Sequence, residues 1–178
     1  DGIDQLLTAT QPGLQTTTYV PNMGGNTVSR TSPDSGITTW MYDGLGNVTQ
    51  QANEFTIDYT YNFGRLMLKT SGDLNPAFDV RYFYDDMGSN SMGRVFQMFD
   101  GSGAQQFAYD AVGNVVEIQR TMSIPFKTGN ANFRTAFTYD TWGRVLDITY
   151  PDLERVEYTY DEGGMLETVI ANKAGTAF

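Results

Sequence analysis

Carboxylates are the side chains of this sequence with the clearest capacity for chemistry. Four of them, Asp152, Glu154, Glu157 and Glu162, cluster near the C-terminal end. Two carboxyl groups held about 5–10 Å apart can hydrolyse a glycosidic bond. Acids that alternate along a strand are more often a solvated face, however, and nothing singles out an acid–base pair among these four. We therefore expect no catalytic residues and no enzyme activity.

The 178 residues contain no His and no Cys, which excludes several other chemistries. There is no Ser-His-Asp triad, no Cys-His dyad, no histidine or thiolate metal site and no disulfide. The 21 acidic residues exceed the 11 basic ones, giving a net charge of −10. This charge opposes binding to phosphate backbones, so nucleic acid is not an expected partner. No apolar run approaches the ~18 residues of a membrane span, and the segment has no signal-peptide core.

A second group of acids recurs at regular intervals along the sequence. It consists of Asp43, Asp85, Asp110, Asp140 and Asp161. Ca²⁺ needs several oxygen ligands. If each acid belongs to its own β-hairpin, neighbouring acids lie ~10 Å apart and are too distant to share an ion. We therefore expect these residues to form turns, and we expect no metal site and no cofactor.

The acids belong to a repeated unit, aromatic-x-Tyr-Asp-x-x-Gly-(Asn/Arg)-apolar. Its copies are anchored at Tyr19, Tyr42, Tyr61, Tyr84, Tyr109, Tyr139 and Tyr160. These tyrosines are 23.5 residues apart on average, which is too short for a helix-turn-helix repeat of ~33 residues but suits two strands and two turns. The residues that we expect to define the repeat structurally are Tyr42, Asp43, Gly46, Tyr61, Gly64, Tyr84, Asp85, Gly88, Tyr109, Asp110, Gly113, Tyr139, Asp140, Gly143, Tyr160 and Asp161.

Each residue type in the unit has a physical role. Aromatic-x-Tyr places two rings on one face of a strand, because side chains alternate. Asp can accept hydrogen bonds from backbone amides two residues on, and Gly supplies the positive φ that closes the turn. Asn47 and Asn114 after the Gly also tolerate left-handed geometry. Alternating apolar residues then predict a return strand with slack for a bulge.

The connecting segments vary in length. Pro- and Asp-containing turns, such as 32–36, 100–103 and 151–154, are predicted at the opposite sheet edge. The copy at Tyr84 continues past Gly88 to a second Gly93-Arg94, which predicts an enlarged turn. Segments 69–80 and 121–134 are longer, so we expect protruding loops there. The arginines at the position after the Gly, namely Arg65, Arg94 and Arg144, are expected to pair with strand acids.

These features predict an all-β fold, a single curved antiparallel sheet of stacked β-hairpins with about a dozen strands. We interpret residues 1–178 as one repeat segment of a larger protein, because the array begins and ends inside a unit. A single layer would expose its aromatic face and its edges, so a homodimer of the segment is also expected.

The recurring Tyr-Asp-x-x-Gly-(Asn/Arg)-(Val/Leu), with Pro-Asp turns between copies, resembles the YD-repeat or Rhs-repeat family over about residues 5–170. The resemblance implies a hairpin array that spirals into a hollow shell in longer relatives. These are bacterial polymorphic toxins, shell components of insecticidal toxin complexes, wall-associated bacterial proteins and teneurins. The resemblance further implies that flanking repeats and an enclosed effector are partners of this segment. It also implies a secreted or cell-surface, envelope-associated location in bacteria. We see no self-cleaving core motif of the family and no effector tail.

Two functions follow from this interpretation. The leading one is a non-catalytic structural scaffold within a shell. The alternative is a carbohydrate-binding or adhesion module, in which a polysaccharide stacks on the tyrosine ladder or binds the segments 69–80 and 121–134. The packed-face interpretation of the tyrosines favours the scaffold.

Overall fold

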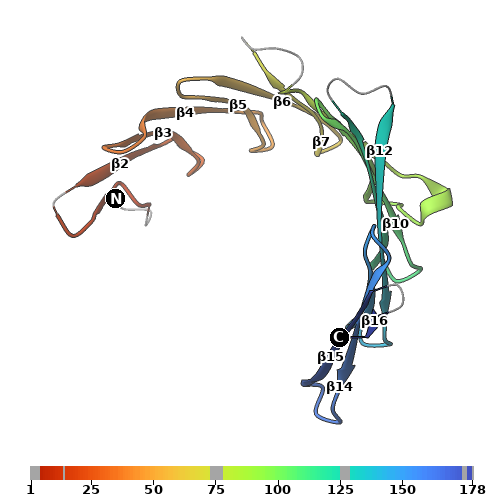
Figure 1. The fold of residues 1–178 in the computed structure, drawn as a ribbon. Coiled ribbons are helices and arrows are strands. Elements are labelled where there is room, and N and C mark those ends of the chain that lie inside the picture. Colours follow the sequence, from red (N-terminus) through yellow and green to blue (C-terminus); the bar gives the residue numbers. More distant parts are fainter. Residues whose placement is uncertain (1–4, 14, 73–77, 125–128, 174–175, 178) are drawn as a thin grey trace. The chain divides into compact units, whose positions relative to one another are not determined.

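The computed structural model describes residues 5–13, 15–72, 78–124, 129–173 and 176–177. Within these ranges sixteen strands form one sheet in which each strand neighbours the next along the chain, from β1 to β16 (Figure 1). The strand pairs with a resolved register are all antiparallel. The predicted all-β sheet of stacked hairpins is confirmed, with more strands than the expected dozen.

The chain divides into two compact units, Asp1–Arg81 and Tyr82–Phe178. The first contains β1 (Thr8–Thr10), β2 (Thr16–Pro21), β3 (Thr27–Ser32), β4 (Gly36–Tyr42), β5 (Val48–Ala52), β6 (Thr56–Asn62) and β7 (Arg65–Ser71), and β8 (Val80–Tyr84) crosses the boundary. The second contains η2 (Met87–Ser89), β9 (Val95–Asp100), β10 (Gly103–Tyr109), β11 (Val115–Ser123), β12 (Asn130–Tyr139), β13 (Val145–Thr149), β14 (Glu154–Tyr160), β15 (Leu166–Lys173) and β16 (Thr176–Ala177). That all of these residues belong to one repeat segment of a larger protein stays a prediction.

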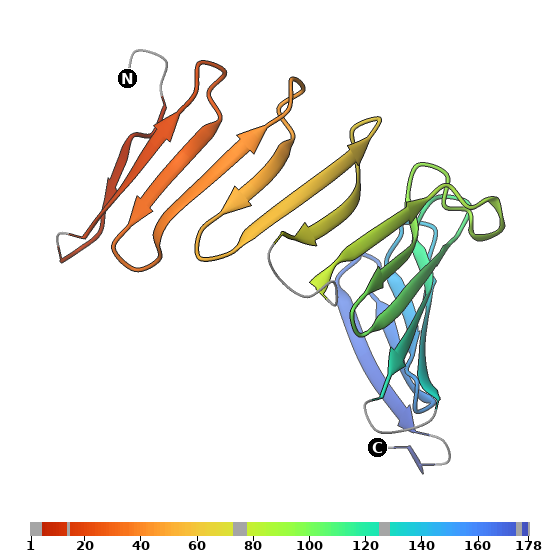
Figure 2. The ribbon, with the colours of Figure 1, turned by 90° about the horizontal axis from the view of Figure 1, so that it is seen from above.

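In the first unit the hairpins lie side by side in chain order (Figure 2). Strand β4 shows how the alternation of side chains orients the sheet. Thr38, Trp40 and Tyr42 lie on one face and are buried or half-buried, whereas Ile37 and Met41 on the other face are 61% and 62% exposed. The aromatic-x-Tyr motif thus places both rings on the more covered face, as predicted.

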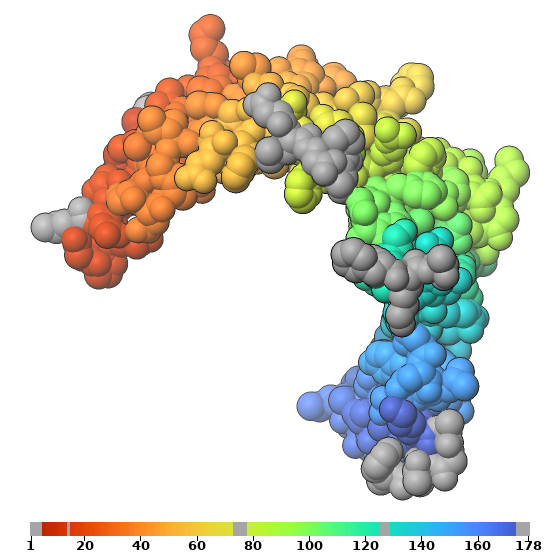
Figure 3. Space-filling view, turned by 45° about the horizontal axis from the view of Figure 1, so that its top comes forward, coloured from red at the N-terminus to blue at the C-terminus, as the bar shows by residue number. Residues whose placement is uncertain are grey.

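In the second unit, the face with the repeat aromatic residues also carries a cross-strand series of apolar side chains. The atoms of this unit follow one another in chain order, from green to blue in Figure 3. Phe107 pairs with Ile118, and Ile148 pairs with Phe137 on one side and Val156 on the other. Side chains directly opposite each other in an antiparallel pair are in contact distance. Apolar residues of the return strands therefore fill the spaces between the aromatic residues.

The described part of each unit has no conventional hydrophobic core. Among the described residues no apolar side chain is fully buried, and the buried residues are Thr38, Ser91 and Asp147. The buried Asp147 carboxylate forms an ion pair with Arg155 and accepts a 3.2 Å hydrogen bond from the Thr149 hydroxyl, which compensates its loss of hydration. Strand pairing and contacts between neighbouring side chains are therefore the main stabilising interactions of this single sheet layer.

Two of the predicted irregularities are observed. Register shifts mark β-bulges where the tyrosine-bearing strands of the repeat pair with their return strands, as between Met41 and Tyr42 and between Thr138 and Tyr139. The enlarged turn is confirmed too, because η2 lies between Asp85 and Arg94, which are joined by a backbone hydrogen bond of 3.3 Å.

The prediction of a protruding loop over residues 121–134 is wrong for most of that segment. Strand β11 continues to Ser123 and β12 begins at Asn130, and Thr121 pairs with Asn132. Apolar and polar residues alternate here well enough to extend the ladder, so the segment makes a longer hairpin instead. Residues 125–128 and, in the other long segment, 73–77 lie outside the described residues; β7 occupies 69–71 of that segment.

Candidate functional site

The Asp-x-x-Gly turns are the most regular sites of the molecule, and the turn at 43–47 shows their construction. The amide of Gly46 donates to the carbonyl of Asp43 at 3.1 Å, and the amide of Asp43 donates to the carbonyl of Asn47 at 2.9 Å. Gly46 has φ +85°, which an L side chain rarely adopts. This is a β-turn followed by a left-handed residue, a common three-residue hairpin connection.

The carboxylate of Asp43 holds this turn closed. Its Oδ1 accepts hydrogen bonds of 2.9 Å from the amides of Leu45 and Asn47, and its Oδ2 accepts one of 2.9 Å from Asn47 Nδ2. The bond from the amide two residues on was predicted from the sequence. The hydrogen bonds from Asn47 lower the pKa of the Asp43 carboxyl below its ordinary value, and those from the amides of Leu45 and Gly46 add to the effect.

Asn47 and Asn114 have a role that sequence reasoning missed. Their φ values are not positive, so the left-handed geometry that Asn tolerates is not used at these positions. Each instead donates a hydrogen bond from its side-chain Nδ2 to Oδ2 of the turn aspartate. The distance is 2.9 Å from Asn47 to Asp43 and 2.8 Å from Asn114 to Asp110. The fixed four-residue spacing between Asp and Asn was the available signal.

In the turn that begins at Asp140, Arg144 occupies the position that Asn47 and Asn114 have in their turns, four residues after the aspartate. Its Nε donates to Asp140 Oδ2 at 2.6 Å, and its amide donates to Oδ1 at 2.9 Å. Burial raises the pKa of Asp140, but hydrogen bonds and the charge of Arg144 more than offset it, so the pKa lies below the ordinary value. The prediction that arginines at this position pair with strand acids is therefore wrong for Arg144, because a turn acid is closer.

The enlarged turn keeps the aspartate but changes the glycine. Asp85 Oδ1 accepts a 2.6 Å hydrogen bond from the amide of Gly93, which has φ +79°. Gly88, which the sequence interpretation placed in the repeat, lies within η2 and does not have a positive φ. Ser91 is fully buried inside the insertion, where its hydroxyl donates to the carbonyl of Asp86 at 3.0 Å.

Four tyrosines of the repeat connect one hairpin to the preceding one. Their hydroxyls donate to the carbonyl at the start of the preceding return strand, as in Tyr42 to Thr27 at 2.6 Å and Tyr109 to Val95 at 2.7 Å. The other two bonds, Tyr139 to Val115 and Tyr160 to Val145, are both 2.8 Å long. Burial raises the pKa values of Tyr109 and Tyr139, so these hydroxyls remain protonated donors at neutral pH.

Two of the arginines that follow a turn glycine form a second connection, to the following hairpin. The guanidinium carbon of Arg144 lies 4.3 Å from the centre of the Tyr160 ring, and that of Arg94 lies 5.6 Å from the Tyr109 ring. These are cation–π distances. A Cβ added to Gly164 would lie 3.1 Å from Arg144 Nη1, so the arginine also covers the next turn.

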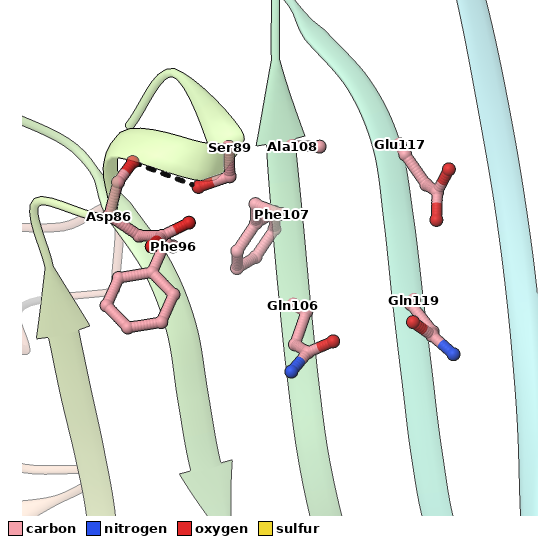
Figure 4. A pocket seen from close by; sticks show the side chains of 8 residues that line it. All are labelled: Asp86, Ser89, Phe96, Gln106, Phe107, Ala108, Glu117 and Gln119. Carbon is pink, nitrogen blue, oxygen red and sulfur yellow. Dashed lines mark hydrogen bonds between the residues drawn. The ribbon is translucent and has the colours of Figure 1, made fainter. Parts of the chain in front are cut away.

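Two hollows among the described residues of the second unit are lined by polar and aromatic side chains. One, of about 270 Å³, is lined by Asp86, Ser89, Phe96, Gln106, Phe107, Ala108, Glu117 and Gln119 (Figure 4). Figure 4 shows Asp86 and Ser89 on the enlarged turn and Glu117 on β11. Glu117 is already paired with Arg134 at 2.7 Å, and Ser89 donates to the carbonyl of Asp86 at 3.3 Å. The second hollow lies between the turns at 140–144 and 161–165 and is lined in part by Trp142, Arg144 and Tyr160.

The carboxylates considered for glycoside hydrolysis have different surroundings. Asp152 forms an ion pair of 2.8 Å with Lys173, and Glu157 forms one of 2.6 Å with Arg155. Glu162 lines the hollow beside Trp142. In the described part of the chain no group of three or more acidic, His or Cys side chains is arranged to hold a metal ion. No helix in that part is long and apolar enough to cross a membrane.

Comparison with solved structures shows which proteins share this arrangement. A mutant form of the Photorhabdus luminescens Tc holotoxin pore is similar with a TM-score of 0.77 and 17% identity, over 90% of this chain and 9% of that chain. The structures titled TcdB2-TccC3-Cdc42 and TcdB2-TccC3 are similar with TM-scores of 0.72 and 0.73 at 15% identity, over 92% and 96% of this chain. The likeness confirms, for the fold, the suspected resemblance to the YD/Rhs repeats of Tc toxin shells.

The chain spans about a tenth of the length of these structures, 9% to 11%. No protein-family model matches the sequence, and no curated protein matches it. The class that the fold and the turns define is therefore an all-β hairpin array of the kind found in Tc toxin components.

Proposed function

We propose that this chain is a non-catalytic structural segment of a β-shell or scaffold in a large bacterial secreted, cell-surface or toxin-type protein. The observation that carries the proposal is the hydrogen bond from each of four repeat tyrosines to the preceding hairpin. Such bonds make each hairpin a support for the next, which is the property that an extended wall requires. The residues in this role are the repeat tyrosines, aspartates and glycines.

The likeness to Tc toxin structures supports the same role. Those structures are about ten times longer than the part matched here, so partners and activity of the whole protein belong to the proposal. We propose flanking repeats of the same protein as the main partners, and an effector enclosed by the completed wall.

A test of enclosure uses the longer protein that contains this segment. Intact-mass measurement and a denaturing gel are expected to show a C-terminal tail that is cleaved yet stays associated until denaturation. A single uncut chain with nothing retained would contradict enclosure and would favour surface display.

The carbohydrate-binding alternative makes a separable prediction. The hydroxyl of Tyr109 is committed to Val95, and its ring lies beneath Arg94, which leaves little of it for a sugar. We expect no saturable binding to a panel of bacterial polysaccharides. Saturable binding that is lost in Tyr84→Ala or Tyr109→Ala while the variant stays folded would overturn the scaffold proposal and establish adhesion.

A further inference from the structure

The hollow beside the enlarged turn lies where the array departs from its repeat. The ladder between β9 and β10 ends at Gln106, whereas the ladder between β10 and β11 continues to Tyr109. Strands β9 and β10 therefore part beyond Gln106, next to the insertion that contains η2. Ala108 leaves further space, because the corresponding residues of other copies, such as Met41 and Thr138, are larger.

The insertion that forms one wall of the hollow is fixed in place. The hydroxyl of the fully buried Ser91 accepts a 2.8 Å hydrogen bond from the amide of Asp86 and donates one of 3.0 Å to the Asp86 carbonyl. Asn90 Nδ2 donates to the carbonyl of Tyr109 at 2.9 Å and so attaches the insertion to the end of β10. Asp86 is thus held beside the sheet before a ligand arrives, which lowers the entropic cost of binding.

The polar groups that line this hollow have unused hydrogen-bonding capacity. The carboxylate of Asp86 and the carboxamides of Gln106 and Gln119 make no hydrogen bond or ion pair to any residue that the structure describes. Glu117 differs, because Arg134 compensates its charge at 2.7 Å. Asp86 is therefore the carboxylate of the hollow that is left for a ligand. Figure 4 shows Gln106 between Asp86 on the enlarged turn and Gln119 on β11.

We propose that this hollow binds the guanidinium group of an arginine side chain from a partner protein. A guanidinium carries five N–H donors in one plane, so it can donate both to the Asp86 carboxylate and to the carboxamide oxygens of Gln106 and Gln119. The rings of Phe96 and Phe107 also line the hollow. Aromatic rings attract a cation through their faces and pack against the apolar stem of an arginine.

The size and the charge of the hollow select this ligand. Its volume of about 270 Å³ is below the range of roughly 300–1,000 Å³ for sites of drug-sized ligands, so it suits one side chain rather than a run of sugar units. The charge of −10 disfavours an anion and favours the approach of a basic protein. This inference goes beyond the scaffold proposal and does not depend on it, because it concerns a single hollow of the second unit.

The test is an NMR titration of the isotope-labelled 178-residue chain with Nα-acetyl-arginine amide. We expect saturable shifts of the side-chain NH₂ signals of Gln106 and Gln119 and of the amide signal of Ser89. Nα-acetyl-citrulline amide has nearly the same shape without the charge, and it should bind at least about tenfold more weakly. Added NaCl should weaken binding of the arginine probe, because salt screens the attraction.

Substitutions locate the site. Asp86→Asn keeps the shape of the side chain and is expected to lower the affinity for the arginine probe about tenfold, as for the loss of a charge-assisted hydrogen bond. Gln106→Leu should also weaken binding. The matched control is Asp34→Asn, which removes the same charge from an exposed turn of the first unit and should leave the affinity unchanged. Circular dichroism and urea unfolding check that each variant is folded.

Several outcomes would overturn the proposal. These are the absence of a saturable response, equal affinities for the arginine and citrulline probes, and full affinity in Asp86→Asn. An equal loss in Asp34→Asn would show a general charge effect instead of a site. If spermidine produces the same shifts at a lower concentration than the arginine probe, the hollow belongs to a free polyamine and the protein partner is wrong.

Discussion

The hydroxyl of Tyr160 donates a 2.8 Å hydrogen bond to the carbonyl oxygen of Val145, the first residue of the preceding return strand. The same relationship joins Tyr139 to Val115. In each case the carbonyl lies where the turn and its bulge interrupt the strand ladder. The tyrosine therefore satisfies a backbone acceptor of the neighbouring hairpin and fixes the spacing between repeats.

Removing this hydroxyl should weaken the array. Tyr139→Phe and Tyr160→Phe each keep the ring and are expected to lower the free energy of unfolding by about 1 kcal/mol, the usual net worth of one hydrogen bond. Urea unfolding measures the change. Tyr158→Phe is the control, since its hydroxyl makes none of the hydrogen bonds found among the described residues. Equal losses in all three variants would show that the inter-hairpin bond is not the cause.

Gly103 should tolerate no side chain. It has φ +146°, and a Cβ there would overlap the carbonyl oxygen of Thr121 and lie 3.1 Å from Met122 Cα. Both neighbours are backbone atoms of β11, so neither can move without disturbing the ladder. We expect Gly103→Ala to destabilise the second unit by about 2–4 kcal/mol. Gly44→Ala, whose Cβ would meet nothing within 4 Å, should be close to neutral. Similar unfolding midpoints for the two variants would refute this explanation.

The pair formed by Asp100 and Arg120 predicts a dependence on acid. A hydrogen bond from Arg120, 2.8 Å long, is the main reason that the pKa of Asp100 falls from 3.8 to about 2. Because the folded pKa lies below the unfolded one, the stabilisation is fully present above about pH 4 and is lost as the pH falls toward 2. Urea midpoints measured across this range should decrease for the wild type and decrease less for Asp100→Asn. Parallel pH profiles would mean that the pair does not contribute.

The turn aspartate should be replaceable by asparagine more easily than by alanine. Asn22 already performs the function in the first unit, where its Oδ1 accepts hydrogen bonds of 2.9 Å from the amide of Gly24 and 3.0 Å from that of Asn26. Asp110→Asn keeps an equivalent acceptor, whereas Asp110→Ala removes the acceptor of the amides of Val112 and Asn114 and leaves that of Gly113 with the backbone carbonyl of residue 110 alone. We expect the alanine variant to melt at a clearly lower temperature than the asparagine variant. If the two melt together, the carboxylate is not what closes the turn.

Local features of the fold could be predicted from the sequence because they depend on neighbours along the chain. Asp43 and Gly46 specify their turn through hydrogen bonds and φ values that lie within five residues. The alternation of Trp40 and Tyr42 with exposed residues likewise follows from strand geometry.

Contacts between hairpins could not be predicted in the same way. The stacking of Arg144 on Tyr160 and the bond from Tyr42 to Thr27 join residues that are about 15 positions apart, and only the strand order brings them together. The choice between Gly88 and Gly93 likewise depended on which amide reaches Asp85. Segment length was misleading for 121–134, because its residues continue the strand pairing rather than leaving it.

The most direct test of the scaffold proposal is to determine the structure of the longer protein in which this segment occurs by electron cryomicroscopy. The account predicts that residues 5–170 form a continuous stretch of wall, with further hairpins paired to both outer strands and the repeat tyrosines bonded to preceding carbonyls. A map in which the segment stands alone on flexible linkers, with its outer strands unpaired, would contradict the proposal.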